Sequence, residues 1–206
     1  YEAIVIDIKE KSKYLNNLPI KYILEFFNSL AIEWLSNPES KFLKYFSSMG
    51  ASFLINFIKK SNLEPLLSES LNNNINYIDN FVYVENLQRK IMAHPKGLIT
   101  HWLAGNVPVL GMISLIQGIV TKNANVIKLP REGGLILPFM ARQIAEHSYD
   151  AGKFVINGSD IMSSCKFVYC DREDSIAQKT LSINSDIRVA WGGREAVESV
   201  MSLPRK

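Results

Sequence analysis

The chain has 206 residues, 47% hydrophobic and 21% charged, a composition typical of a folded globular protein. Its net charge of +3 is scattered rather than gathered into a basic stripe, which argues against nucleic acid as a partner. No apolar run approaches the roughly 18 residues that a membrane span needs, and acidic residues interrupt the apolar start of the chain, so no signal peptide is expected.

The first part of the chain, residues 1–96, is predicted to be a mainly helical segment. Its apolar residues recur at helical spacing over long stretches, whereas the end of the segment has short β-like runs. The expected elements are a strand at 3–8, a helix at 19–35, a break at Asn37-Pro38, a helical stretch at 40–60 interrupted by Gly50, an Asn-rich loop at 72–76, and strands at 81–84 and 89–93. We therefore expect a β element near residues 80–93.

From residue 97 to residue 206 the pattern alternates between short apolar strands and helices. Such alternation predicts an open parallel sheet covered by helices on both faces. The expected strands are 98–103, 125–129, 166–170 and 187–191, with 153–156 as a weaker fifth, and the expected helices are 108–121, 134–147, 174–184 and 194–202. Helix 108–121 is apolar on most of its surface, so we expect other elements to pack outside it.

Polar side chains follow the first two strands of this region. Asn106 precedes a helix, where its oxygen could cap an orphan N–H and its NH2 group could donate to a developing oxyanion. Lys128 ends a hydrophobic strand, and it could either extend to water or bind a ribose hydroxyl or phosphate. Because ligands of open α/β sheets bind at the carboxyl ends of the strands, we expect Asn106 and Lys128 to lie side by side at a pocket rim.

Two further features favour a phosphate ligand at the same edge. Arg131 follows Lys128 by three residues, and its planar guanidinium matches phosphate oxygens. Gly192 and Gly193 end the last strand, where they could form a tight turn or let the backbone approach a pyrophosphate. The chain has no G-x-G-x-x-G motif, so a bound dinucleotide would not use the usual fingerprint.

The remaining candidates for chemistry are interpreted as structural. Cys165 and Cys170 have no second pair, and the three histidines are dispersed, so no metal site is expected. Asp171 beside Cys170 would oppose a lowered thiol pKa, and both cysteines are expected to be inert. Sparse cysteines fit a reducing, cytoplasmic compartment.

Three segments in order resemble the LuxC-type acyl-CoA reductases, a branch of the aldehyde dehydrogenase superfamily. They are Ala104-Gly105-Asn106-Val107-Pro108, Val126-Ile127-Lys128-Leu129-Pro130 and the block from Ser185 to Val197, which reads D-x-x-x-A-W-G-G-x-E-A-V from Asp186. The resemblance covers roughly residues 89–200, and the last block is its most specific part. Residues 1–88 resemble the family only in helical character.

The resemblance implies a Rossmann-like NAD(P) domain and the reduction of a fatty acyl-CoA or acyl-protein thioester to a fatty aldehyde through a cysteine thioester. Asn106 would then be the oxyanion donor, Lys128 would touch the adenosine ribose, and Gly192 and Gly193 would face the cofactor phosphates. Many NAD-using relatives carry a glutamate where Arg131 stands, so NADPH is expected rather than NADH. The family also suggests an acyl-protein synthetase partner and a homo-oligomer formed through residues 80–93.

The family's nucleophilic cysteine lies downstream of the glycine pair, in a second domain. Neither Cys165 nor Cys170 occupies its place, so this chain is expected to hold the cofactor part and to be inactive alone. Two alternatives stay open at this point. One is another oxidoreductase of the superfamily, such as an acyl phosphate reductase or an NAD-dependent aldehyde dehydrogenase, and the other is a non-catalytic nucleotide-binding module.

Overall fold

The computed structural model describes residues 2–37 and 39–206. Of the break predicted at Asn37-Pro38, Pro38 lies outside the described residues, whereas Asn37 follows the last residue of a helix, Ser36, as predicted. The first part of the chain is helical, as predicted. Its elements are α1 (Glu2–Lys11), α2 (Lys13–Asn17), α3 (Ile20–Ser36), α4 (Lys41–Phe46), the 3-10 turn η1 (Ser47–Met49), α5 (Ala51–Ile58), α6 (Lys60–Ser70) and the 3-10 turn η2 (Ile75–Ile78). The predicted interruption falls at Gly50, whose φ of +90° favours glycine. Helix α6 was not predicted.

The strand predicted at residues 3–8 is wrong, because this segment forms α1. Val5 and Ile8, three residues apart on one helical face, are buried against a cluster that includes Leu98 and Val126 of the sheet. Ile6 points the other way and is 71% exposed. The three adjacent apolar residues at 4–6 resemble a strand locally, but tertiary packing of one face decides for a helix.

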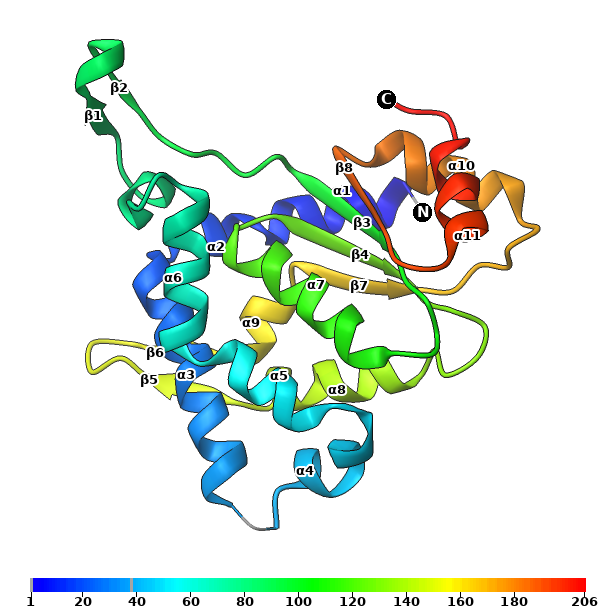
Figure 1. The fold of residues 1–206 in the computed structure, drawn as a ribbon, viewed down its shortest axis with the longest axis horizontal. Helices are drawn as coiled ribbons and strands as arrows, with labels where there is room; N and C mark the ends of the chain where they lie inside the picture. Colours follow the sequence, from blue (N-terminus) through cyan, green and yellow to red (C-terminus); the bar gives the residue numbers. More distant parts are fainter. Residues whose placement is uncertain (1, 38) are drawn as a thin grey trace.

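A β-hairpin follows the helical segment, close to the predicted position. Strands β1 (Val82–Val84) and β2 (Arg89–Ile91) pair antiparallel, joined by the 3-10 turn η3 (Glu85–Leu87). Figure 1 shows this hairpin projecting away from the rest of the molecule on a long arm that returns to the sheet. The hairpin therefore has few neighbours within the described part of the chain.

The central element is a four-stranded parallel sheet in the order β7-β4-β3-β8, which confirms the predicted fold class. The strands are β3 (Leu98–Trp102), β4 (Ala124–Lys128), β7 (Cys165–Val168) and β8 (Ile187–Ala190), each within two residues of its predicted bounds. The weaker fifth strand does not join this sheet. It forms β6 (Val155–Asn157), which pairs antiparallel with β5 (Ser148–Asp150) in a separate hairpin.

Helices cover both faces of the sheet (Figure 1). The remaining helices are α7 (Pro108–Val120), α8 (Ile136–Ala145), α9 (Gly158–Met162), α10 (Ser175–Asn184) and α11 (Arg194–Met201). Helix α7 packs on β3 and β4, whereas α1 and α10 contact the opposite face and α11 contacts β8. Helices α3, α5 and α8 pack against α7, which confirms that this apolar helix is covered on its outer side.

One hydrophobic cluster joins the helical segment to the sheet, and it includes Phe26 and Leu30 of α3 with Met112 and Ile116 of α7. The two parts of the chain are therefore packed on a shared core. Among the residues described, none of the helices has the length and apolar character needed to cross a membrane.

Candidate functional site

The four parallel strands end at the same level, and a cavity lies beyond their carboxyl ends. Trp102 pairs with Lys128 on one side and with Ala190 on the other, and Lys128 pairs with Val168, so the residues after each strand share one edge. The cavity has a volume of about 630 Å3 and is lined from all four strand ends. The chain leaves β3 toward β4 and β7 and then crosses to β8, so this edge is a topological switch point, where α/β sheets bind ligands.

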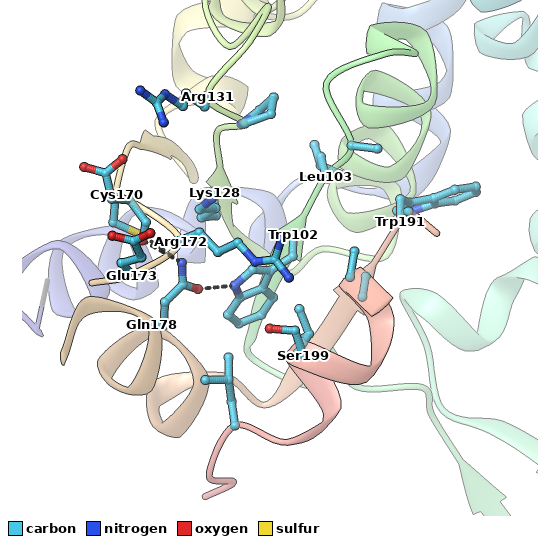
Figure 2. A pocket seen from close by; sticks show the side chains of 18 of the residues that line it. Trp102, Leu103, Lys128, Arg131, Cys170, Arg172, Glu173, Gln178, Trp191 and Ser199 are labelled. Carbon is cyan, nitrogen blue, oxygen red and sulfur yellow. Dashed lines mark hydrogen bonds between the residues drawn. The ribbon is translucent and has the colours of Figure 1, made fainter. Parts of the chain in front are cut away.

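Three cationic side chains line this cavity: Lys128 at the end of β4, Arg131 beyond it, and Arg172 after β7. Within residues 2–37 and 39–206, none of the three forms an ion pair or an intramolecular hydrogen bond. Figure 2 shows Arg172 extending toward Trp102, whereas Arg131 lies at the edge of the view and points outward. The cavity also has the carboxylates of Asp171 and Glu173 on its wall.

Sequence reasoning missed Arg172. It stands in a run of acidic residues, Asp171, Glu173 and Asp174, which suggests a solvated loop. The available signal was its position four residues beyond the end of β7, on the same edge of the sheet at which Lys128 ends β4. The parallel register brings the two strand ends together, because β4 and β7 are direct neighbours.

A buried indole forms the floor of the cavity, and α10 holds it in place. Trp102 Nε1 donates to Gln178 Oε1 at 2.8 Å, and the Gln178 amide nitrogen donates to the Asp171 carbonyl at 3.2 Å and to Cys170 Sγ at 3.6 Å (Figure 2). Trp102 and Gln178 are only 7% and 8% exposed. Their polar atoms are satisfied, so this floor is a fixed apolar surface rather than a reactive one.

The two cysteines do not have the character of nucleophiles. Burial raises the pKa of the Cys165 thiol to about 12. Burial also raises the pKa of Cys170, which lines the cavity, although the charge of Lys128 opposes this shift. Because the thiolate is the reactive form, these surroundings agree with the prediction that both cysteines are inert.

Asn106 does not cap α7, so that interpretation is wrong. The cap position is occupied by Val107, no side chain caps this helix, and Asn106 is exposed. Its amide makes no hydrogen bond within the described part of the chain. Pro108 begins the helix and lacks an N–H, which reduces what a cap could satisfy. The amide is therefore available to a ligand.

Asn106 and Lys128 do not line one cavity, contrary to the expectation that they stand side by side. Asn106 lines two smaller clefts: one of about 250 Å3 between the start of α7 and the end of β8, and one of about 430 Å3 that it shares with Arg131. The first of these clefts and the larger cavity share four wall residues, Leu103, Ala104, Trp191 and Gly192. The two predicted residues thus belong to adjoining compartments of one edge.

The glycine pair lies where the cavity meets the start of α11. Gly193 is the residue before this helix, and a Cβ placed on it would meet no atom within 4 Å. Gly192 has Ala196 beneath it at 3.0 Å from such a Cβ. Neither glycine has a positive φ, so the backbone conformation does not demand them. What they provide is open access to the N–H groups of a helix N-terminus, where anions bind.

The histidines lie outside the cavity, as expected of structural residues. His101 is 1% exposed between Ser114 and Asn125, and His147 contacts Glu33 and Ser29. Among the residues that the structure describes, no three His, Cys, Asp or Glu side chains gather as metal ligands would.

A parallel sheet of this order with a cation-lined cavity at its switch point defines a Rossmann-like α/β protein. A family model described as acyl-CoA reductase (LuxC) matches residues 15–206. The chain belongs to this family of acyl-CoA reductases.

Curated relatives carry the name long-chain acyl-protein thioester reductase. The chain is 29% identical to the Vibrio harveyi protein over 201 residues, covering 90% of the chain and 40% of that relative. It is 29% identical to the Photobacterium phosphoreum protein over 89% of the chain and 38% of the relative. The Photorhabdus laumondii protein is 36% identical over 108 residues, which are 52% of the chain and 21% of the relative. The chain thus spans about 40% of the length of the first two.

Proposed function

We propose that this chain is the cofactor-binding part of an NADPH-dependent reductase that converts a fatty acyl thioester to a fatty aldehyde. The observation that carries the proposal is a set of cations, unpaired within residues 2–37 and 39–206, beside an open glycine turn at the carboxyl edge of the sheet. Cations without protein partners favour an anionic ligand, and the family and its relatives define the reaction class.

The residues present fit a phosphorylated dinucleotide. A cavity of about 630 Å3 is in the range of cofactor sites. In this proposal Lys128 would hold the adenosine ribose, Arg131 and Arg172 would bind a 2′-phosphate, and the N–H groups after Gly192 and Gly193 would bind the diphosphate. When bound, NADPH supplies a hydride. Glutamate at the position of Arg131 would favour NADH, so arginine there supports NADPH.

Asn106 is assigned the role of oxyanion donor. Its amide is exposed, free of protein partners among the described residues, and lines the cleft that adjoins the cofactor cavity. A donor aimed at a developing oxyanion contributes about 3–4 kcal/mol to transition-state stabilisation. In a longer form of the protein that contains the nucleophile, Asn106→Ala should lower turnover by roughly 10²–10³ and leave NADPH affinity unchanged. An unchanged turnover would remove Asn106 from the mechanism.

The nucleophile is assigned to a cysteine outside this chain. Both cysteines of the chain have raised pKa values, and the relatives are more than twice as long as the matched region. Such a cysteine would form the acyl thioester that is then reduced. We therefore expect the 206-residue chain to form no aldehyde by itself, and measurable aldehyde from it would overturn this assignment.

The projecting hairpin is the proposed surface for self-association. Phe81, Tyr83 and Leu87 are 64%, 52% and 50% exposed there, and an isolated two-stranded hairpin is marginally stable in water. Because the relatives are named as acyl-protein thioester reductases, the acyl donor is proposed to be acyl-CoA or an acyl protein, and the proposed partner is an acyl-protein synthetase.

Calorimetric titration of the chain with NADPH and NADH tests the cofactor assignment. We expect NADPH to bind more tightly, and Arg131→Ala and Arg172→Ala each to weaken NADPH by roughly tenfold and NADH by less, since each removes one charged contact. Arg142→Ala is the matched control, because Arg142 pairs with Glu146 on the outer surface of α8. A preference for NADH would favour the NAD-dependent alternative, and failure to bind either would overturn the proposal.

A further inference from the structure

A network of side-chain hydrogen bonds runs from the carboxyl edge of the sheet into the core. Trp191 Nε1 lies 3.4 Å from Ser114 Oγ, which lies 2.8 Å from His101 Nδ1. His101 Nε2 lies 3.1 Å from Asn125 Oδ1, and the Asn125 amide nitrogen donates to the Asn123 carbonyl at 2.7 Å. This hydrogen-bond network thus links the end of β8 with α7, β3 and β4.

If His101 is neutral, the donors and acceptors of this hydrogen-bond network can be assigned in only one way. Asn125 Oδ1 only accepts, so His101 Nε2 carries the proton and Nδ1 accepts from the Ser114 hydroxyl. The Ser114 oxygen is then free to accept from the indole N–H of Trp191. Burial keeps the imidazole neutral, since it lowers the pKa of His101 to about 4.

The inner members of this hydrogen-bond network are buried. His101, Ser114 and Asn125 are 1%, 4% and 0% exposed. A Cβ on Gly118 would collide with Asn125 Oδ1, so the absence of a side chain on α7 makes room for this amide. Fully satisfied buried networks of this kind fix their members in one arrangement.

Trp191, the outermost member of this hydrogen-bond network, lies at the carboxyl edge of the sheet. It lines both the large cavity and the cleft that contains Asn106, and it is 39% exposed. Its backbone N–H also donates to the Trp102 carbonyl at 2.8 Å, so the residue is held at both ends. Figure 2 shows its indole apart from the other labelled side chains, on the far side of the cavity from Lys128 and Arg172.

We infer that Trp191 is a binding residue for the nicotinamide end of the cofactor, and that Ser114 and His101 are positioning residues that hold its indole. This inference rests on the proposed function. Asn106 adjoins the cavity through two clefts: one shares Trp191 with the cavity, and the other shares Pro130 and Arg131. A ligand whose phosphates lie near Arg172 and the glycine turn reaches Asn106 past Trp191 when it follows the first cleft, between the start of α7 and the end of β8. A fixed indole offers the flat ring a stacking surface there.

Two ligands separate this role from general binding: NADPH, and adenosine 2′,5′-bisphosphate, which lacks the nicotinamide half. Ser114→Ala removes the acceptor of the outer hydrogen bond and also the hydroxyl that bonds to His101 Nδ1, whereas Trp191→Phe removes the indole N–H and one of the two rings. Each should weaken NADPH by about three- to tenfold, the range that an aromatic contact supplies, and change the affinity for the bisphosphate less than about twofold. The double variant should lose less than the sum of the two single losses, because both variants break the hydrogen bond between Trp191 and Ser114.

Ser164→Ala is the matched control, since Ser164 is a buried serine whose hydroxyl, among the described residues, bonds only to the Ile161 carbonyl of its own turn and to the adjacent Cys165. The NMR resonance of the Trp191 indole N–H should shift in Ser114→Ala and stay in place in Ser164→Ala. Additive losses in the double variant, equal losses for both ligands, or NADPH affinity like that of Ser164→Ala would each overturn the inference.

Failure of the proposed function gives a different result. A wild-type chain that binds neither ligand would remove the cofactor assignment and the nicotinamide contact with it. The indole resonance, measured without ligand, would still report whether Ser114 and His101 hold Trp191.

Discussion

Two lysines lie at opposite ends of β4 and have opposite surroundings. Lys122 precedes the strand at the amino edge of the sheet, where its side chain is 5% exposed and its ammonium lies 2.6 Å from Asp79 Oδ1. Lys128 ends the strand at the carboxyl edge, lines a cavity, and has no ion pair among the described residues. The comparison teaches that partners, rather than residue type, separate a charge that stabilises the fold from a charge that is free to meet a ligand.

The same difference extends to the two edges as a whole. At the amino edge, Asp186 accepts from the Leu98 N–H and pairs with Lys9 and Lys206. Asp79 accepts from the Ile20 N–H at the start of α3 in addition to binding Lys122. These carboxylates tie α1, α3 and the sheet together. By contrast, the three cations that line the cavity at the carboxyl edge, Lys128, Arg131 and Arg172, form no ion pair with a carboxylate among the described residues.

Breaking the amino-edge pair should produce the largest effect. Asp79→Asn leaves the Lys122 ammonium buried without its counter-charge, and we expect the free energy of unfolding to fall by about 3 kcal/mol. Urea denaturation followed by circular dichroism measures this change. Lys128→Met is the matched comparison and should change unfolding by less than about 0.5 kcal/mol. Equal losses in both variants would erase the distinction between the two edges.

The buried histidine predicts a pH dependence of stability. Burial lowers the pKa of His101 from 6.5 to about 4. Between these values an unfolded His101 is protonated and the folded one is not, so stability falls as pH drops from 6.5 to 4, by roughly 3 kcal/mol in total.

Urea denaturation at pH 7, 6 and 5 measures this dependence. His101→Gln should have the shallower pH slope, because the titrating group is gone. His94→Gln is the control, since His94 is exposed, and it should keep the slope of the wild type. A slope unchanged in His101→Gln would show that His101 is not buried as a neutral ring.

Lys128→Met should have the smallest effect on the free energy of unfolding and a clear effect on the affinity for NADPH. Lys128→Met removes the cation that faces the cavity, and we expect NADPH affinity to fall by roughly tenfold, as for a lost charged hydrogen bond. Fluorescence titration of NADPH measures the change. Lys166→Met is a suitable control, because Lys166 lies near Asp7 of α1 and outside the cavity. Unchanged affinity in Lys128→Met would return Lys128 to the role of a lysine that only reaches water.

Much of the fold was predictable because the signals are local. Short apolar strands such as Leu98–Trp102 alternate with helices along the sequence, and this alternation predicts a parallel sheet. Prediction failed where tertiary packing decides, as in α1, where the burial of Val5 and Ile8 overrides a strand-like run.

The site was predictable only in part. Lys128 could be found from its place at a strand end, and Arg172 could have been found by the same reasoning. The prediction that Asn106 caps α7 was wrong, because Val107 occupies the N-cap position of this helix. The hydrogen bonds of Ser114 to His101 and Trp191 span 13 and 77 positions of sequence, and no local pattern reveals such pairs.

The most direct measurement is a titration of the isotope-labelled chain with NADPH, followed by backbone amide NMR. The account predicts shifts at the carboxyl edge, in the amides of Lys128, Arg172, Gly192 and Gly193, and none at Lys122 or Asp186 at the amino edge. Shifts confined to the amino edge, or none at millimolar NADPH, would contradict it.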